Sequence, residues 1–328
     1  MSVDGASPDV RSYYGRPVLK QPVWKPEIPW YFFCGGLAGA SSSLAAGARL
    51  AGNERLARSA SLTALAGLTI SPILLAKDLG RPERFYNMLR VFKVTSPMSV
   101  GTWILSASGA ASAVAAACEL LDVLPGVKRA GETAAGLLGL PLSTYTAALL
   151  ADTAVPVWHE ARRELPLLFA GGAAASAGAA SALLTPTEQA GPARRLALTG
   201  AALELAATAA MERRLGKLLA EPYRTGEASG LAKAAKALTA GGGMLLALGG
   251  RRRPGAVAAG MLLLGGSICG RWAVFKAGFE SARDPKYTVI PQRERADRKG
   301  TRVTTRPASA PAGGRSARRS ARDERRPH

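Results

Sequence analysis

Carboxylates and a histidine beside long apolar segments are the groups of this chain most able to transfer protons. Glu204 lies in the middle of the apolar stretch ALTGAALELAATAAM, whereas Asp78 and Asp152 each stand at the end of such a stretch. A charge inside a bilayer is unfavourable, so a carboxylate there must be protonated, paired or reached by water. His159 follows Asp152 in the sequence, and histidine is the side chain best suited to exchange protons at neutral pH. We therefore interpret Asp78, Asp152, His159 and Glu204 as candidates for proton transfer.

Each of these candidates also has a structural alternative. Glu204 could be a neutral side chain that hydrogen-bonds a neighbouring helix, and His159 could be a structural residue at a membrane edge. Asp78 could belong to a local ion-pair cluster that orders its loop. The functional and structural interpretations both remain open from the sequence.

A tyrosine in the fourth apolar segment could bind a polar ligand. Tyr145 lies in LPLSTYTAALLADT, four residues after Pro141, which removes a backbone donor. The Tyr145 hydroxyl could bond a quinone carbonyl, with Ser143 nearby, or it could bond across helices. Asp152 follows after seven residues, two helical turns, and therefore shares nearly the same helix face.

The connector between the second and third apolar segments is unusually charged. It runs from Lys77 to Ser99, KDLGRPERFYNMLRVFKVTSPMS. Its basic residues begin directly at the end of an apolar run, which indicates a polar site at a membrane surface. Lys77, Arg81 and Arg84 are candidates for docking a protein partner, or for ordering the loop.

These candidates must be positioned by long apolar helices. About 20 residues are needed to cross a bilayer as a helix, and the sequence predicts about eight such spans. They are 30–50, 59–77, 99–121, 134–155, 165–184, 195–211, 231–249 and 255–275. The predicted fold is an all-α integral membrane protein, and the alternative is an Ala-rich soluble helical bundle. We divide the chain into an extended N-terminal arm (1–29), a transmembrane domain (30–277) and a basic, largely disordered C-terminal tail (278–328).

Composition restricts the chemistry further. With three dispersed cysteines, no CxxC pair and two histidines, we expect no haem, no iron–sulfur cluster and no metal in this chain. The first 29 residues lack the apolar core of a secretory signal peptide. The net charge is +20, and we assign the basic tail to binding anionic lipid headgroups rather than nucleic acid. Basic residues on the N-terminal side predict cytoplasmic termini in the plasma membrane.

Several segments together resemble the NrfD family, the PsrC-like membrane subunit of polysulfide reductase. They are WYFFCGGLAGASS, DLGRPERFYNML, TSPMSVGTWIL, STYTAALLADTAVPVWHEARRELPLLF and the closing RWAVFKAGFESARDPKYTVIPQRER. The resemblance covers most of residues 13–295. It implies eight helices in two four-helix bundles and no haem.

The resemblance also implies partners and a substrate. Such subunits exchange electrons and protons with menaquinone or ubiquinone, beside a ferredoxin-like iron–sulfur subunit and a molybdopterin catalytic subunit. Tyr145 matches the family's quinone-contacting tyrosine. The family's polar groups near the first span fall here on Pro29, Trp30 and Tyr31, and we include Trp30 among the quinone-binding candidates.

The leading hypothesis is therefore a haem-free, quinone-reactive membrane subunit of an oxidoreductase complex, inactive alone because it holds no electron carrier. One alternative is a proton channel or transporter, which buried Glu204 and Asp152 would also suit. Another is a membrane anchor without a working quinone site. The substrate of the catalytic subunit and the direction of electron flow do not follow from this sequence.

Overall fold

The computed structural model describes residues 18–303. These residues form helices joined by connecting segments, with no strand among them. The first part of the predicted arm, residues 1–17, and the tail from 304 lie outside the described residues. The long helices are α1 (Glu27–Leu50), α2 (Glu54–Asp78), α4 (Pro97–Leu120), α5 (Pro125–Ala151), α7 (Leu165–Leu184), α8 (Gly191–Leu219), α10 (Ser229–Gly249) and α11 (Arg253–Arg283). The short elements are the 3₁₀ turn η1 (Pro82–Arg84), α3 (Phe85–Met88), α6 (Pro156–Glu160) and α9 (Glu221–Arg224).

Six of the long helices, α2, α4, α5, α7, α10 and α11, are long and apolar enough to cross a membrane. The predicted all-α membrane class is therefore confirmed, whereas the count of about eight spans stays a prediction. The two helices outside this set, α1 and α8, have polar or small residues in their apolar runs. For α1 these are the serines and glycines of CGGLAGASSSLAAG, and for α8 they are Glu204 and the charged ends.

Helix limits differ from the predicted spans where helices continue beyond the apolar run. Helix α1 begins at Glu27, and Pro29 is tolerated because the first-turn N–H groups have no intrahelical acceptor. Helix α5 begins at Pro125, well before the predicted residue 134. Helix α8 extends to Leu219, with a break at Gly216, whose φ is +69°. Apolar length alone therefore underestimates these helices, because their polar ends are also helical.

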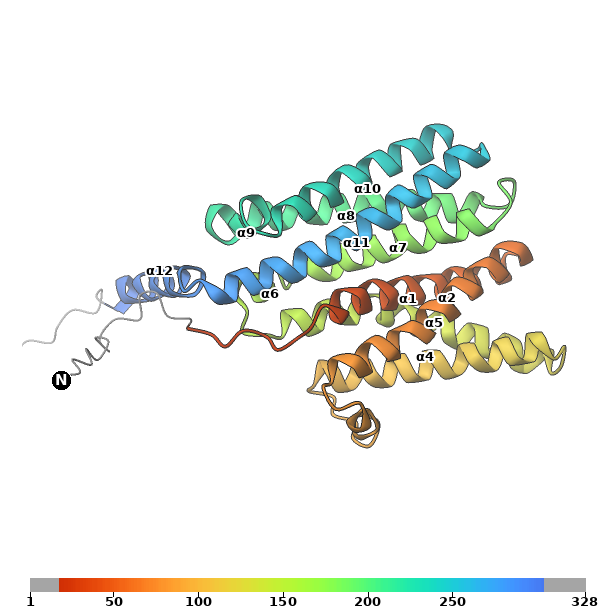
Figure 1. Ribbon diagram of the computed structural model, residues 1–328, viewed down its shortest axis with the longest axis horizontal. Coiled ribbons are helices and arrows are strands. Elements are labelled where there is room, and N and C mark those ends of the chain that lie inside the picture. Colours follow the sequence, from red (N-terminus) through yellow and green to blue (C-terminus); the bar gives the residue numbers. More distant parts are fainter. Residues whose placement is uncertain (1–17, 304–328) are drawn as a thin grey trace, which may run out of the picture. The chain divides into compact units, whose positions relative to one another are not determined.

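Helix α1 is the central helix of the long-helix unit (Figure 1), in contact with α2, α5, α7 and α11. Its closest crossing is with α5, where a Cβ atom on Gly39 would lie 2.8 Å from the Ser143 backbone nitrogen and 3.1 Å from the Leu142 Cβ. The Ser43 hydroxyl donates to the Gly136 carbonyl of α5 at 2.7 Å. Small residues at such a crossing let two backbones approach closely.

A side chain at Gly39 is therefore expected to destabilise the protein. Because Gly39→Ala overpacks the α1–α5 crossing, we expect it to lower the free energy of unfolding by about 1–3 kcal/mol. Gly47→Ala is the matched control, since a Cβ atom at Gly47 in the same helix meets nothing within 4 Å. Thermal unfolding in detergent would measure both, and equal unfolding temperatures for the two variants would contradict this view of the crossing.

Different side-chain contacts hold the helix ends at the two ends of this unit. We call the end where α2 and α5 finish the Asp78 end. There the Lys25 backbone N–H donates to the Asp78 carboxylate at 2.8 Å, and the Trp24 ring stacks on Trp158 with 5.4 Å between centroids. The opposite end is held by Arg49, which pairs with Glu54 and with Glu132. Trp24 and Lys25 are thereby held against the helices at the Asp78 end.

The C-terminal part of the described chain forms one more helix, α12 (Lys286–Val303). From Val289 onward the chain is a separate unit. The sequence predicts no regular structure beyond about Gln292, and the described helix continues past that point. Its charges recur at the four-residue spacing that supports an exposed helix, as for Arg293 and Asp297. The limits of the three predicted domains stay predictions.

Candidate functional site

An open cavity of about 590 Å³ lies at the Asp78 end of the helices. It is formed by the chain just before and within the start of α4, by the last turns of α5, and by α6 with the residues that follow it. The lining residues include Val94, Thr95, Pro97, Val100, Tyr145, Asp152, His159 and Arg162. Three of the predicted site residues, Tyr145, Asp152 and His159, are thus brought together, with the end of the Lys77–Ser99 connector as one wall.

The Tyr145 side chain lines this cavity. Its ring packs edge-on against Tyr31, with 6.4 Å between ring centroids. Gly101 of α4 makes room for the ring, because a Cβ atom there would overlap it. The hydroxyl oxygen is buried and has no hydrogen-bond partner in the described structure. A buried, unpaired hydroxyl is unfavourable, and a ligand that reaches this group would supply the missing hydrogen bond.

Asp152 and His159 place titratable groups at the cavity wall. Asp152 follows the last residue of α5, and its side chain is exposed. Helix α6 returns the chain so that His159 Nδ1 lies 3.2 Å from the Ala151 carbonyl oxygen. Arg162 then donates to the His159 carbonyl at 3.3 Å. The cavity therefore combines a hydroxyl, a carboxylate and an imidazole.

Other predicted site residues lie elsewhere. The Ser143 hydroxyl donates to the Leu140 carbonyl of its own helix at 2.7 Å. Trp30 packs against Trp272 with 6.3 Å between ring centroids. Asp78 anchors Lys25, as described above, and none of these three residues lines the cavity. The roles predicted for them stay predictions, and the contacts observed for Asp78 are structural ones.

The connector presents an exposed surface beside the cavity. Lys77, Arg81 and Arg84 are charged residues of this surface. Large apolar side chains of the same connector are exposed as well: Tyr86, Val91, Phe92, Val94 and Met98. Basic and aromatic residues together are typical of a surface that a partner covers.

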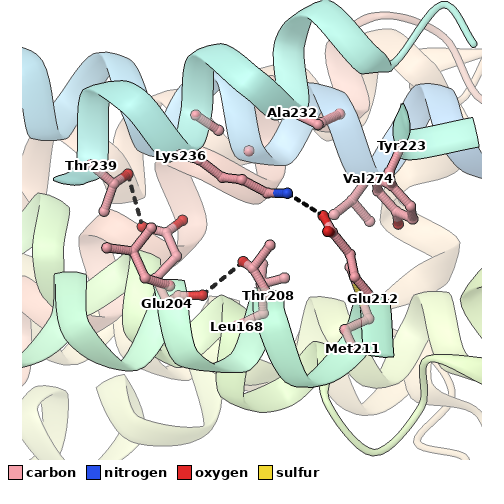
Figure 2. A pocket seen from close by; sticks show the side chains of 14 residues that line it. Leu168, Glu204, Thr208, Met211, Glu212, Tyr223, Ala232, Lys236, Thr239 and Val274 are labelled. Atoms are coloured by element: carbon pink, nitrogen blue, oxygen red, sulfur yellow. Dashed lines mark hydrogen bonds and ion pairs between the residues drawn. The ribbon is translucent and has the colours of Figure 1, made fainter. Parts of the chain in front are cut away.

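Glu204 belongs to a second, buried site between α8 and α10 (Figure 2). Its side chain accepts from the Thr239 hydroxyl at 3.5 Å. Arg271 of α11 is only 1% exposed and faces the same region, where a Cβ atom on Gly172 would lie 2.7 Å from Glu204 Oε1 and 3.0 Å from Arg271 Nη2. Gly172, which has no side chain, thus leaves room for the Glu204 carboxylate and the Arg271 guanidinium between α7, α8 and α11.

Arg271 is held by α7 rather than by a carboxylate hydrogen bond. Its Nη2 donates to the Phe169 carbonyl at 2.8 Å, and its guanidinium carbon lies 3.9 Å from the Phe169 ring centroid. Sequence reasoning missed this residue. The signal was present, because Arg271 is a single charge inside the run LLLGGSICGRWAVF, and an ionisable residue in a membrane span indicates function or a buried partner.

Among the described residues, no group of three or more histidine, cysteine or acidic side chains could hold a metal ion. The three cysteines are free thiols. The candidate site residues named above offer hydroxyl, carboxylate, imidazole and guanidinium groups.

These features define the class of protein. Apolar helices of membrane-spanning length surround a buried acid–base pair, and a ligand-sized cavity opens at one end of them. The protein is a multi-pass helical membrane protein. It belongs to the NrfD family: the family model described as polysulphide reductase, NrfD, matches residues 18–210.

The family match covers α1 to most of α8 and includes the Tyr145 cavity and Glu204. Helices α10 and α11, with Arg271, follow the matched residues. None of the curated proteins compared with the chain matches it. The chain is thus an NrfD-family membrane subunit, and such subunits typically belong to a polysulfide-reductase-like oxidoreductase complex.

Proposed function

We propose that this subunit exchanges electrons and protons between a membrane quinone, menaquinone or ubiquinone, and the other subunits of an oxidoreductase complex. In this proposal α1 and α8 also cross the bilayer. The resulting eight spans form one bundle of α1, α2, α4 and α5 and another of α7, α8, α10 and α11. Pairwise contacts support this grouping, because the extensive α1–α2, α4–α5, α7–α8 and α10–α11 interfaces all fall within a bundle.

The observation that carries the proposal is the Tyr145 side chain at the wall of the open cavity, with a buried hydroxyl that has no partner among the described residues. Ligand cavities of about 300–1,000 Å³ accommodate drug-sized molecules, and the present cavity has about 590 Å³. Apolar walls from Val94, Pro97 and Val100 suit a quinone ring, and the hydroxyl suits one of its carbonyl oxygens. The residues present therefore fit such a substrate.

Asp152 and His159 supply protons in this proposal. A quinone takes up protons when it is reduced and releases them when the quinol is oxidised, so the reaction needs groups that exchange protons with water. Both side chains are exposed and line the same cavity as Tyr145. A histidine and a carboxylate at one wall can transfer protons near neutral pH. Glu204 acts apart from this cavity, as a proton-transfer residue within the helices.

The exposed connector is proposed as the docking surface for an iron–sulfur subunit, which in turn contacts a molybdopterin catalytic subunit. Lys77, Arg81 and Arg84 provide charge, and the exposed Tyr86 and Phe92 provide apolar area. Their position beside the cavity supports the arrangement, because a partner's cluster docked there lies close to a bound quinone. In our proposal this end of the subunit faces the cytoplasm.

The test is Tyr145→Phe in the assembled complex. Removing one hydrogen bond of about 0.5–1.5 kcal/mol is expected to weaken quinone binding by about 2–13-fold, seen as a higher KM for quinone in steady-state turnover. Tyr287→Phe is the control, because this buried tyrosine is outside the cavity. Unchanged quinone kinetics in Tyr145→Phe would instead indicate an anchor without a working quinone site.

A second candidate function is a proton channel or transporter, which the buried Glu204–Arg271 pair favours. Proton flux through the purified chain in proteoliposomes, without partner subunits or quinone, would distinguish this candidate from the quinone-reactive subunit.

A further inference from the structure

Two polar stripes face each other across the interface of α8 and α10 (Figure 2). On α8, Glu204, Thr208 and Glu212 recur every four residues and therefore lie on one helix face. The Thr208 hydroxyl donates to the Glu204 carbonyl at 2.7 Å. This stripe extends from the middle of α8 toward its last turns.

The facing stripe on α10 consists of Lys236 and Thr239, one turn apart. Lys236 Nζ pairs with Glu212 Oε1 at 2.5 Å, and Thr239 donates to Glu204 Oε2 at 3.5 Å. The ion pair therefore stands at the outer end of the stripes, and Glu204 at the inner end. Polar residues on two facing helices inside a membrane need partners or water.

The space between these stripes fits water and little else. The cavity offers about 30 Å³, and one water molecule needs about 10–15 Å³ on this measure, so roughly two waters fit. Its wall includes the Tyr223 hydroxyl, which is buried and has no partner in the described structure. Beyond Glu204, Arg271 Nε and Nη1 are likewise buried and unpartnered. Several buried polar groups are thus placed to hold water.

The outer end of the cavity lies at the Asp78 end of the helices. Tyr223 belongs to α9, and the neighbouring Glu221 pairs with Lys286, just beyond the end of α11, at 3.0 Å. Lys236 is 42% exposed at its side chain, whereas Glu204 is 5% exposed. Accessibility therefore falls from the ion pair inward to the acid.

We infer that this cavity is a water-filled proton inlet that begins at the Lys236–Glu212 ion pair and ends at Glu204, with Arg271 as the fixed cation behind the acid. Water bridging Glu212, Thr208 and Glu204 carries the proton, and the ion pair closes the outer end. The inlet shares no lining residue with the Tyr145 cavity. This inference rests on the proposed function in one respect only, which is that Glu204 exchanges protons.

The water path is tested by thiol labelling of the full chain in liposomes, with Cys34, Cys118 and Cys269 replaced by alanine. A cysteine at Thr208 is expected to bind Ag⁺, a thiol-binding ion about the size of a water molecule, about tenfold faster than one at Ala207. The loss of thiols that still react with a maleimide after denaturation measures this rate. Ala207 is adjacent on α8 and only 5% exposed. Equal, slow labelling of Thr208→Cys and Ala207→Cys would overturn the inlet.

The role of the ion pair is tested in the same background. Lys236→Met is expected to raise the labelling rate of the Thr208→Cys thiol severalfold, because the outer end is no longer closed. Lys233→Met is the matched control, since Lys233 is an exposed lysine on the same helix. No difference between the two lysine variants would overturn the closing role of Lys236–Glu212.

The inner end is tested by carbodiimide modification. Dicyclohexylcarbodiimide adds to a protonated carboxyl group in an apolar site and leaves a stable N-acylurea, which peptide mass spectrometry locates. Label on Glu204, absent in Glu204→Gln, is the expected result. Rapid thiol labelling at position 208 without carbodiimide label on Glu204 would show a water cavity that does not lead to an exchangeable acid. None of these readouts requires quinone, so failure of the inlet and failure of the Tyr145 site are distinguishable.

Discussion

Replacing Arg271 with methionine is expected to lower the free energy of unfolding by about 3–5 kcal/mol, the usual effect of removing one member of a buried charge pair. Arg271 is 1% exposed, donates to the Phe169 carbonyl and faces Glu204. Methionine keeps an unbranched, flexible side chain that is shorter than arginine, and it leaves both the carbonyl and the carboxylate without this partner. Denaturant unfolding of the detergent-solubilised chain would measure the loss. Arg251→Met, at an exposed arginine beyond α10, should have little effect.

A double-mutant cycle separates the charge pair from simple packing. Glu204→Gln removes the carboxylate charge while keeping its volume. If the two charges stabilise each other, combining Arg271→Met with Glu204→Gln should cost clearly less than the sum of the two single changes. Additive effects would mean that Arg271 stabilises the fold only through Phe169, and that the acid–base pair has been misinterpreted.

The combined change Asp152→Asn and His159→Gln is expected to lower quinone-linked turnover of the assembled complex by about 10²–10⁴-fold, the range for lost acid–base catalysis. Both side chains line the cavity that contains Tyr145. Each replacement keeps a polar side chain, so binding of quinone should change far less than turnover. Steady-state turnover together with inhibitor affinity would show this split.

Asp122→Asn is the matched control for that variant. Asp122 is an exposed aspartate in the turn between α4 and α5, at the opposite end of the helices, and its φ of +51° is one that asparagine tolerates. It should leave turnover unchanged. If the Asp152 and His159 variant lost binding and turnover equally, these residues would shape the cavity rather than transfer protons.

The relative positions of residues within one helix can be predicted from the sequence. Tyr145 and Asp152 are two turns apart, and the helical period alone is enough to place them on one face of α5. His159 follows within a few residues, so the short return through α6 keeps it near. The apolar runs likewise predict where the long helices lie, because the bilayer requires a nearly constant span length.

Pairings between distant helices are not predictable in the same way. Arg271 and Glu204, 67 residues apart in sequence, lie near each other only because α7, α8 and α11 pack together around Gly172. The Asp78 carboxylate likewise accepts the Lys25 N–H from the N-terminal arm, a contact that the sequence does not predict. Helical periodicity describes one helix at a time, and such partners depend on the three-dimensional packing of several.

The central claim is that a quinone binds at the Tyr145 cavity, and covalent labelling with a photoreactive quinone tests it most directly. The assembled complex is illuminated with the labelled quinone, with excess unmodified quinone as competitor, and the modified peptides are identified by mass spectrometry. Competed label is expected on the segments that wall the cavity, around Val94–Val100 and Tyr145–His159. Competed label confined to other parts of the chain, or only on partner subunits, would contradict the proposed site.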